Sequence, residues 1–586
     1  MKKLIFLLIG TALLFSSCRK DVNDPIFVPP VVVTDPGILE DYEPTVTPIT
    51  GSVDGFINDE NGNAIQGATV KLGTQTTTTN VDGHFALLNV AMNKAGTIIQ
   101  VTQNGYFDGS RRFLPTGNGV DRVRIQLLQK VFDQTVDGAA GGAASIPGGT
   151  GTIDFPANSI VDANGDVYTG SVDIAVKYLD PSAEITSQQM PGNLFGVNEE
   201  LEERMLASYG MIAVELIDNN GNPLNLGQGT PATISMPVPA SMQANAPATI
   251  PLWSYNEEYG VWVEEGEATL TNGSYVGDVS HFSWWNCDIP AEYVELSLKA
   301  LDQNGNPMVN YIVSLTSTIY GTSRGFTNSQ GIVSGIIPAG ETLLLEVTKV
   351  GCVGAVHSQN VGPFTNPTNA LTITANLSSA QLTTITGSAV CNGVPITNVI
   401  MKLEMGSFTD YTFLPSNFTV TQLFCTQGIP YSVSMIDPVS SMQSIVYTGF
   451  TGSTNNLGTI DACQNTLSEY ITLDLNGTSY TLLQVYDSLG FGGTGVYGYY
   501  SGTGNDYINV GLNFNGTTTG AYPGALNSVN VDYSLSSSNF YGTGNMTSFD
   551  VTTFNTTDII GTFSGSVTDL NGTTTFPISG SFDCDL

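Results

Sequence analysis

Side chains that could carry acid–base or metal chemistry are scarce in this chain. A serine triad or a catalytic zinc site needs histidines that converge on one place. The sequence holds only His84, His281 and His357, and each falls in a different predicted module. We therefore predict no catalytic residue, no metal site and no bound cofactor.

Two glycine-rich segments match enzyme motifs. The segment G-T-S-R-G around Ser323 fits G-x-S-x-G, and Gly493–Gly498 fits G-x-G-x-x-G. The first motif needs a strand that turns into a helix, and the second needs a strand–loop–helix unit. Strand-like sequence surrounds both segments, so we interpret them as chance matches in a chain with 65 glycines.

Clustered carboxylates are a further candidate. The segment E-E-L-E-E-R-M-L, Glu199–Leu206, is the one stretch that predicts a helical turn or two, and its carboxylates are expected to face solvent. Asp and Asn oxygens also cluster in D-A-N-G-D at Asp162 and D-N-N-G-N at Asp218. Calcium favours such ligands, but an EF-type loop has glycine at its sixth position and these have it at the fourth. Tight turns are the favoured interpretation.

The aromatic residues form the most distinctive cluster. All four tryptophans fall close together, at Trp253, Trp262, Trp284 and Trp285. Exposed aromatic faces can stack on sugar rings, whereas buried ones fill a sandwich core. Core packing is the favoured interpretation, but Trp262, Trp285 and Tyr255 are kept as possible ligand-binding residues, with Trp285 the best candidate for exposure.

The cysteine count predicts disulfides. The chain has seven cysteines. Cys18 follows the N-terminal apolar run and is treated below as part of an export signal, which leaves six. An even number in an exported protein indicates pairing. We predict Cys391–Cys425 within one small module and Cys463–Cys584 joining the ends of the last domain, with free buried thiols as the alternative. No C-x-x-C spacing occurs, which argues against structural zinc.

Composition predicts the fold class that must position these residues. At 586 residues, with 65 glycines and 12% charged residues, the chain favours several domains of short strands joined by turns. The fold class expected is all-β, with tandem β-sandwich modules and a C-terminal antiparallel β barrel or sandwich. The net charge of −35 excludes nucleic acid as a partner, because phosphate backbones require cationic side chains.

The first residues predict export. Lys2 and Lys3 precede an apolar run, Leu4–Phe15, which is too short to span a bilayer. The following F-S-S-C resembles the lipobox of bacterial lipoproteins, which implies removal of residues 1–17, lipid on Cys18 and membrane anchoring through it. An ordinary secretory signal is the alternative.

A tether is expected next. Residues 18–47 are proline-rich and predict an extended lipid-anchored linker. Its R-K-D-V-N-D start resembles the signals that send lipoproteins of Gram-negative bacteria to the surface of the outer membrane. We therefore expect the outer membrane, with the cell surface favoured over the periplasmic face.

Repeated strand–turn patterns divide the folded part of the chain. In 48–130, I-T-G-S-V-D-G-F-I-N, D-E-N-G-N-A and A-T-V-K-L resemble the carboxypeptidase regulatory-like (transthyretin-like) domain, a seven-stranded sandwich without catalytic residues. The pattern recurs from Leu298 and from Ile385, which predicts further sandwiches at 289–378 and 379–464.

Two other units complete the predicted organisation. In 131–288, P-L-W-S-Y-N-E-E-Y-G-V-W and H-F-S-W-W-N resemble ZU-type modules and cartilage intermediate layer proteins, in which the module serves structure and interaction. Residues 465–586 alternate with the strand period and predict the C-terminal antiparallel domain.

These features favour a non-catalytic lipoprotein that acts in surface binding, adhesion or scaffolding. The alternatives are a glycan-binding accessory lipoprotein of a nutrient-uptake system and, less favoured, an exported hydrolase. The partners expected are the membrane, through lipidated Cys18, and glycans or extracellular and envelope proteins.

Overall fold

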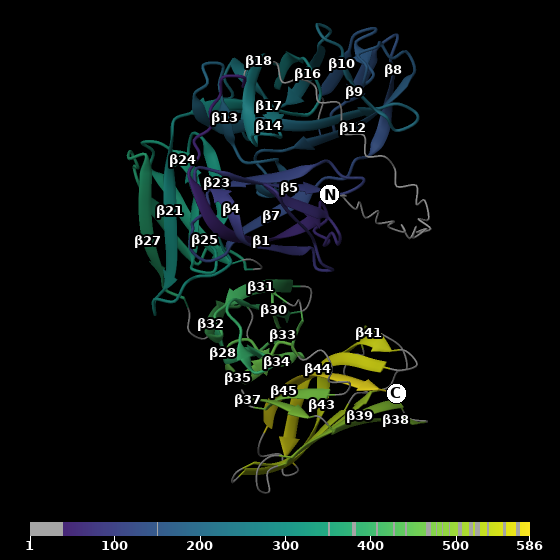
Figure 1. Cartoon of the computed structure of the whole chain (residues 1–586), viewed down its shortest axis with the longest axis vertical. Coiled ribbons are helices and arrows are strands. Elements are labelled where there is room, and N and C mark those ends of the chain that lie inside the picture. The colour runs from purple at the N-terminus through teal and green to yellow at the C-terminus, as the bar shows by residue number, and fades with distance from the viewer. Residues whose placement is uncertain are drawn as a thin grey trace, which may run out of the picture.

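The computed structural model consists almost wholly of β-strands arranged in modules (Figure 1). It describes residues 39–463 apart from 149–150, 350–351, 378–381, 406–407, 426–427 and 440–441. Between 470 and 585 it describes the residues outside 476–477, 483, 491–492, 502–506, 515–519, 522–527, 536–537, 555–557 and 570–574. Within these ranges no helix is long and apolar enough to cross a membrane.

The first module is a sandwich of two sheets. One sheet has the order β4-β1-β7, and the other has the order β3-β2-β5-β6. Strand β1 pairs antiparallel with β4 and parallel with β7. Val53, Ile57 and Ile99 are fully buried between the sheets, because alternate residues of each strand point inward. The bounds are β1 (Pro48–Asp59), β2 (Thr69–Leu72), β3 (Gln75–Thr78), β4 (His84–Asn93), β5 (Thr97–Thr102), β6 (Gly109–Phe113) and β7 (Asp121–Leu127).

The same topology recurs in the third module. Its sheets have the orders β24-β21-β27 and β23-β22-β25-β26, and β21 again pairs antiparallel with one neighbour and parallel with the last strand. The bounds are β21 (Tyr293–Asp302), β22 (Tyr311–Ser317), β23 (Gly321–Phe326), β24 (Ile332–Pro338), β25 (Leu343–Lys349), β26 (His357–Val361) and β27 (Thr368–Ala375).

The fourth module is a further copy. Strand β28 lies between β32 and the parallel β35, and β31-β30-β33-β34 form the facing sheet. The bounds are β28 (Leu382–Cys391), β29 (Val394–Pro395), β30 (Val399–Met405), β31 (Phe408–Leu414), β32 (Asn417–Leu423), β33 (Pro430–Ile436), β34 (Tyr447–Phe450) and β35 (Thr454–Asp461).

The second module, between the first two copies, joins its strands in one 13-stranded network. One core contains Ile153, Ile212 and Trp285, and another contains Trp253 and Trp262. Its strands are β8 (Phe132–Asp137), β9 (Gly142–Ser145), β10 (Thr152–Phe155), β11 (Ile160–Val161), β12 (Ser171–Leu179), β13 (Phe195–Val197), β14 (Glu203–Ile217), β15 (Pro223–Leu226), β16 (Ala232–Pro237), β17 (Thr249–Asn256), β18 (Val261–Thr271), β19 (Ser274–Val279) and β20 (Trp284–Ala291). The short helices are α1 (Thr186–Gln189) and η1 (Gln243–Asn245).

The C-terminal domain is an antiparallel sheet around a core that includes Ile471, Val510 and Phe582. It joins the fourth module through the parallel pair β35 and β37. Its strands are β36 (Tyr470–Leu475), β37 (Thr478–Leu482), β38 (Gln484–Gly490), β39 (Gly493–Ser501), β40 (Tyr507–Phe514), β41 (Gly520–Ala521), β42 (Ser528–Leu535), β43 (Ser538–Phe554), β44 (Asp558–Asp569) and β45 (Thr575–Asp585). The predicted fold class, all-β with tandem sandwich modules, is confirmed.

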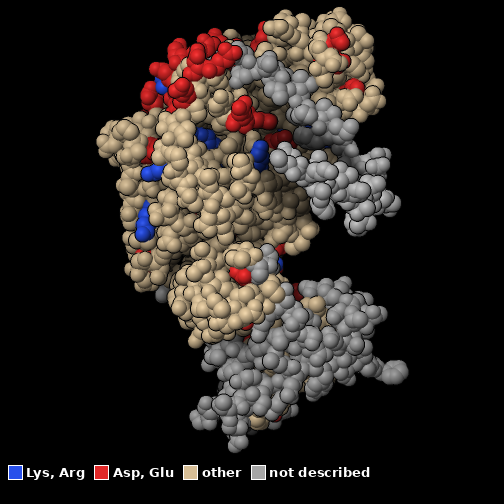
Figure 2. All heavy atoms as spheres, in the orientation of Figure 1, with Lys and Arg blue, Asp and Glu red and all other residues tan. Residues whose placement is uncertain are grey.

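The modules are stacked against one another. Figure 1 shows the first, second and third modules grouped together, with the fourth module beneath them and the C-terminal domain at the far end. Acidic side chains gather on the second module (Figure 2). In the same module, partial burial and the charges of Glu199 and Glu200 raise the pKa of Glu264, so neighbouring carboxylates there repel one another.

Candidate functional site at the module junctions

The predicted ligand-binding aromatics lie in the interior of the second module. The exposed fractions of Trp262, Trp285 and Tyr255 are 0%, 1% and 5%. The Nε1 group of Trp285 donates to the carbonyl oxygen of His281 at 2.8 Å, so its polar atom needs no solvent. The structure shows core packing, the favoured interpretation, and Trp285, the best candidate for exposure, is buried. Both faces of β20 are covered, since Trp285 lies in one core of the module and Trp284 in the other.

Tyr255 has a structural role that the sequence did not indicate. Its hydroxyl lies 2.7 Å from Oγ of Ser110 on β6, so it joins the second module to the first. The Nε1 group of Trp262 donates to the carbonyl oxygen of Asn193 at 3.0 Å. These three rings are therefore in core or junction contacts and are not available for stacking on a sugar.

The disulfides differ from the predicted pairing. Cys391 is bonded to Cys463, and Cys352 is bonded to Cys425. The predicted pairs Cys391–Cys425 and Cys463–Cys584 are therefore wrong. The physical reason is topology: β28 and β35 are parallel neighbours, which brings Cys391, at the end of β28, beside Cys463, just after β35.

The Cys352–Cys425 bond has a consequence for assembly. Cys352 follows β25 in the third module and Cys425 follows β32 in the fourth, so this bond links two modules covalently. Cys287 is a buried free thiol, and burial raises its pKa. Two disulfides indicate that the folded chain resides in an oxidising compartment outside the cytoplasm.

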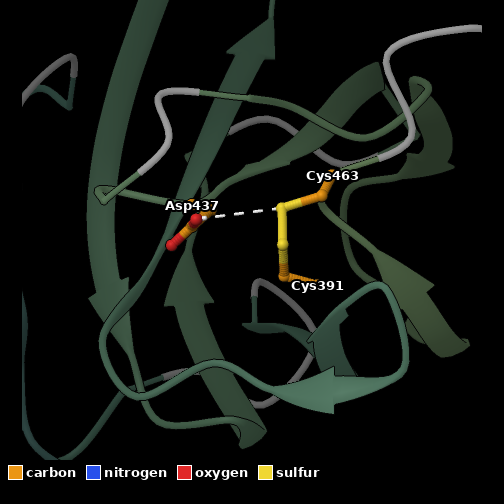
Figure 3. Close-up of side chains that lie close together, drawn as sticks. All are labelled: Cys391, Asp437 and Cys463. Carbon is orange, nitrogen blue, oxygen red and sulfur yellow. Dashed lines mark hydrogen bonds between the residues drawn. A yellow bond between two sulfur atoms is a disulfide. The ribbon is translucent and has the colours of Figure 1, made fainter.

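One cluster has the composition of a metal site. Ligand atoms of Cys391, Asp437 and Cys463 lie within 4.8 Å of one another (Figure 3). Both sulfur atoms are consumed by the disulfide, and metal binding requires thiolates. With the disulfide formed, the cluster offers a metal only the Asp437 carboxylate, whose Oδ2 lies 3.8 Å from Sγ of Cys463.

The acidic segments also have structural roles. Residues 199–202 form a turn that leads into β14, so the predicted helical turn is wrong. At Asp218, Oδ1 accepts the backbone N–H groups of Asn220 and Asn222, both at 2.8 Å. Asp162 makes the same contacts to Asn164 and Asp166, and these hydrogen bonds lower its pKa. These aspartate carboxylates therefore stabilise turns by accepting backbone N–H groups.

The two enzyme-like motifs lie in ordinary strands. Ser323 lies in the middle of β23, and Gly493–Gly498 opens β39. Neither segment leads into a helix. The three histidines lie in the first, second and third modules, so the structure does not bring them together.

A buried ion network joins the first module to the fourth, and it is the most unusual polar cluster of the described residues. Nε of Arg122 donates to Oδ1 of Asp54 at 3.1 Å within the first module. Its Nη1 donates to Oδ1 of Asp410 in the fourth module at 2.5 Å, and its Nη2 donates to the Tyr411 carbonyl oxygen and to Asp54. The side chains of Arg122, Asp54 and Asp410 are all at most 3% exposed.

The third module also reaches this network. Nδ2 of Asn310 donates to Oδ2 of Asp410 at 2.6 Å, so both carboxylate oxygens of Asp410 are used. Nζ of Lys349, at the end of β25, donates to Gln422 of the fourth module at 2.9 Å. Burial alone would raise the pKa of Asp410, but the charges of Arg122, Lys349 and Arg124 hold it below its usual range.

Aromatic rings cover the network. The rings of His84 and Tyr411 are stacked, with centroids 3.9 Å apart, and Phe56 meets both edge-on. Nε2 of His84 lies 3.3 Å from Oδ2 of Asp54. Burial lowers the pKa of His84 and outweighs the opposite effect of Asp54. Around this lie the buried side chains of Val120, Ile400 and Phe413, so the junction is apolar as well as ionic.

A second junction attaches the second module. Glu203, at the start of β14, accepts the hydroxyl groups of Tyr42 at 2.9 Å and Tyr293 at 2.7 Å. Lys177 of the second module binds Glu60 of the first at 2.9 Å. The described modules are therefore fixed to one another at several points.

Sequence reasoning missed these junction residues. In D-R-V-R-I-Q-L the inward positions Val123, Ile125 and Leu127 are apolar, and the alternate arginines resemble a solvated face. The one available signal is that Arg122 and Arg124 are two of only seven arginines in a strongly acidic chain.

Comparison with known proteins finds partial similarity. No protein-family model matches the chain. Cartilage intermediate layer protein 1 of Sus scrofa is 32% identical over 121 residues, which is 20% of this chain and 19% of that protein. Cartilage intermediate layer protein 2 of Mus musculus is 28% identical over 208 residues, 33% of this chain and 17% of that protein. The chain therefore spans less than a fifth of the length of these relatives.

Solved structures show only remote likeness. The minor pilin GBS52 of Streptococcus agalactiae has a TM-score of 0.13 and 12% identity, over 29% of this chain and 96% of that one. The major pilin subunit BcpA of Bacillus cereus has a TM-score of 0.13 and 13% identity, over 56% and 100%. The Bacillus anthracis TIE protein has a TM-score of 0.14 and 8% identity, over 73% and 74%.

Proposed function

We propose that this chain is a non-catalytic, lipid-anchored surface protein that acts in adhesion or scaffolding. The observation that carries the proposal is the buried junction formed by Arg122, Asp54 and Asp410. It fixes sandwich modules that are far apart in the sequence into one body. A rigid body held at one end is suited to presenting surfaces at a distance from a membrane.

The anchor in this proposal is Cys18, which lies outside the described residues. Acyl chains on Cys18 would tether the protein, and the proline-rich linker to residue 47 would separate the modules from the bilayer. The disulfides are consistent with an exported chain. The outer membrane and its outer face are the proposed location.

The similarity to cartilage intermediate layer proteins supports an interaction role over a catalytic one. It covers a fifth to a third of the chain, so it informs a part of the protein only. The first, third and fourth modules repeat one sandwich topology, and such stacked repeats can build an elongated body with extended binding surfaces.

Protease shaving of intact cells tests the location. Proteinase K is the suitable reagent, because Lys402 is the last basic residue and trypsin has no site beyond it. Loss of the C-terminal immunoblot signal in intact cells is expected. A Cys18→Ala variant, which cannot be acylated, should instead appear in the soluble fraction. Protection of the wild type until the outer membrane is permeabilised would overturn the surface location.

Cell attachment tests the role. A deletion strain is compared with strains that carry the wild type or Cys18→Ala, on surfaces coated with extracellular matrix proteins and on uncoated surfaces. Reduced retention of the deletion strain, restored only by the wild type, is expected. Equal retention of all strains on every surface, with wild-type envelope integrity, would contradict both adhesion and scaffolding.

A further inference from the structure

A large cavity lies where the first three modules meet. Its volume is about 790 Å³. The first module contributes β6 and β7, the strands at one open side of its sandwich. The third module contributes β23 and β24, which lie at an open side of that sandwich, and the second module contributes residues from Pro181 to Leu194.

Most arginines of this acidic protein line the cavity. Of the seven arginines of the chain, five line it: Arg111, Arg112, Arg122, Arg124 and Arg324. Arg122 is neutralised by Asp54 and Asp410, and Arg324 lies 3.3 Å from Glu184. Among the described residues no carboxylate forms an ion pair with Arg111, Arg112 or Arg124. These three cations therefore line the cavity without a carboxylate at ion-pair distance, although Asp410 and Asp54 act on Arg124, and Glu203 on Arg112, from farther away.

These three side chains also have unused donors. Nη2 of Arg111, Nη1 of Arg112 and Nε of Arg124 are buried and make no hydrogen bond. Their other contacts are to neutral groups: Arg111 donates to the Gly192 carbonyl oxygen at 3.1 Å, and Arg112 donates to that of Ala95 at 2.8 Å. A buried charge without a partner costs stability, so a site of this kind favours a bound anion.

The charge persists at physiological pH. Burial lowers the pKa of Arg111 and of Arg124 to about 10, which leaves both guanidinium groups protonated near neutrality. Arg124 also lies 4.8 Å from the centroid of Phe56, so its position is set by packing. A fixed guanidinium with free N–H groups matches the geometry of a carboxylate or phosphate.

Another part of the cavity lining is apolar. Leu296, Leu298 and Val313 of the third module line it and belong to the buried core of that sandwich. Gly325 on β23 and Gly335 on β24 lie at the same open side. A Cβ atom added at Gly335 would meet no atom within 4 Å. The cavity therefore has arginines on one part of its lining, and on another part it opens toward the apolar core of the third module.

We propose that this cavity binds a small amphipathic organic anion. Its carboxylate or similar oxyanion binds at the arginine-lined part of the cavity, which Arg111 and Arg124 help to form, and its aliphatic body enters the third module between β23 and β24. This site goes beyond the adhesion and scaffolding role and does not depend on it.

Titration calorimetry on residues 19–586, which lack the predicted signal and the lipidation site Cys18, tests the proposal. The probe is decanoate below its micelle concentration. Decyltrimethylammonium has a comparable chain with the opposite charge, and inorganic phosphate and glucuronate are anions without the chain. We expect one decanoate per protein and at least tenfold weaker binding of the three other probes, because charged hydrogen bonds and chain burial both contribute.

Matched variants locate the site. Arg111→Gln and Arg124→Gln remove the charge, and each should weaken decanoate binding about tenfold. Gly335→Leu places a side chain in the open space and should weaken it similarly while both arginines remain. Arg204→Gln removes an arginine outside the cavity and should leave binding unchanged. Circular dichroism and melting profiles check that each variant is folded.

Several outcomes would overturn the proposal. They are no decanoate binding by the folded wild type, equal binding of decyltrimethylammonium, and binding unchanged in the folded arginine variants and in Gly335→Leu. Binding of phosphate or glucuronate as tightly as decanoate would also overturn it, because the site would then recognise the anion without the aliphatic body.

Discussion

Arg122 and Asp410 are joined by a buried hydrogen bond of 2.5 Å although 288 residues separate them in the sequence. Arg122 lies on the last strand of the first module, and Asp410 lies on β31 of the fourth. Because Asp54 and Asn310 complete the hydrogen bonding, the pair is satisfied from three modules at once. This arrangement makes the relative position of those modules depend on a few charged side chains.

Replacing Arg122 tests that dependence. Arg122→Met leaves Asp54 and Asp410 buried without their cation. Loss of one partner from a buried ion pair costs about 3–5 kcal/mol. We expect a clear drop in the midpoint of thermal or urea unfolding of the unit that contains the first and fourth modules.

Two further variants decide whether charge is the cause. Arg204→Gln breaks an exposed pair with Glu202 and Glu292 and should cost less than about 1 kcal/mol. Adding Asp54→Asn and Asp410→Asn to Arg122→Met should recover part of the stability, since the buried charges are then gone. An Arg122→Met protein as stable as the wild type would show that the network does not hold the junction.

The same network predicts a loss of stability in acid. Burial holds the pKa of His84 below its usual value of 6.5, so the unfolded chain takes up a proton before the folded chain does. Folding stability should therefore fall as the pH drops below about 6.5. Asp54 and Asp410 act in the same direction below their usual 3.8, because Arg122 and its neighbours lower both pKa values against the opposing effect of burial.

Melting temperatures between pH 7.5 and pH 5 measure this effect. His84→Gln keeps a hydrogen-bond donor beside Asp54 but has no titratable ring. The variant should show a flatter pH dependence in this range than the wild type. Identical slopes for the two proteins would mean that His84 does not contribute to the acid sensitivity.

Strand content was predictable from the sequence because it depends on local patterns. Apolar alternation and aspartate turns such as Asp59, whose Oδ1 accepts the N–H groups of Asn61 and Asn63, are readable within a dozen residues. The recurrence of these patterns also indicated tandem sandwiches. The contacts between modules were not predictable in this way, because nothing in the sequence around Asp410 indicates that it pairs with Arg122.

The tryptophans and cysteines show the same limit. Alternation gives two faces of a strand but does not say whether both will be covered, as they are at Trp284 and Trp285 on β20. A disulfide requires two Cβ atoms within about 4.5 Å. That distance depends here on the parallel pairing of β28 with β35, which the sequence did not reveal.

Peptide mapping under non-reducing conditions tests the corrected disulfides. Pepsin or chymotrypsin digests should contain linked peptides with Cys352 and Cys425, and others with Cys391 and Cys463. Each bond closes a loop of more than 70 residues, for which chain entropy predicts a stabilisation of about 4 kcal/mol. Cys391→Ser with Cys463→Ser should therefore lower the unfolding midpoint. Linked peptides with Cys391 and Cys425 would contradict the observed pairing.

A buried carboxyl group in the second module predicts a stabilising substitution. Asp288 is fully buried on β20, and its Oδ1 makes no hydrogen bond, while Oδ2 accepts from Nδ2 of Asn286 at 2.5 Å. Burial raises the pKa of Asp288 well above 3.8, against the opposing effect of its hydrogen bonds. The unfolded chain releases this proton at lower pH than the folded chain does, so stability is lost as the pH rises above about 3.8.

Asp288→Asn removes this penalty and keeps an oxygen that accepts from Asn286. We expect the variant to be more stable than the wild type by about 1–3 kcal/mol at pH 7, with the difference shrinking toward about pH 3, below the usual value of 3.8, where the wild-type carboxyl is mostly protonated in both states. Asp154→Asn, at an exposed position on β10, is the matched control and should change stability little at either pH. Destabilisation by Asp288→Asn at pH 7 would instead mean that the carboxyl is ionised in the folded protein and held by contacts that the amide cannot replace.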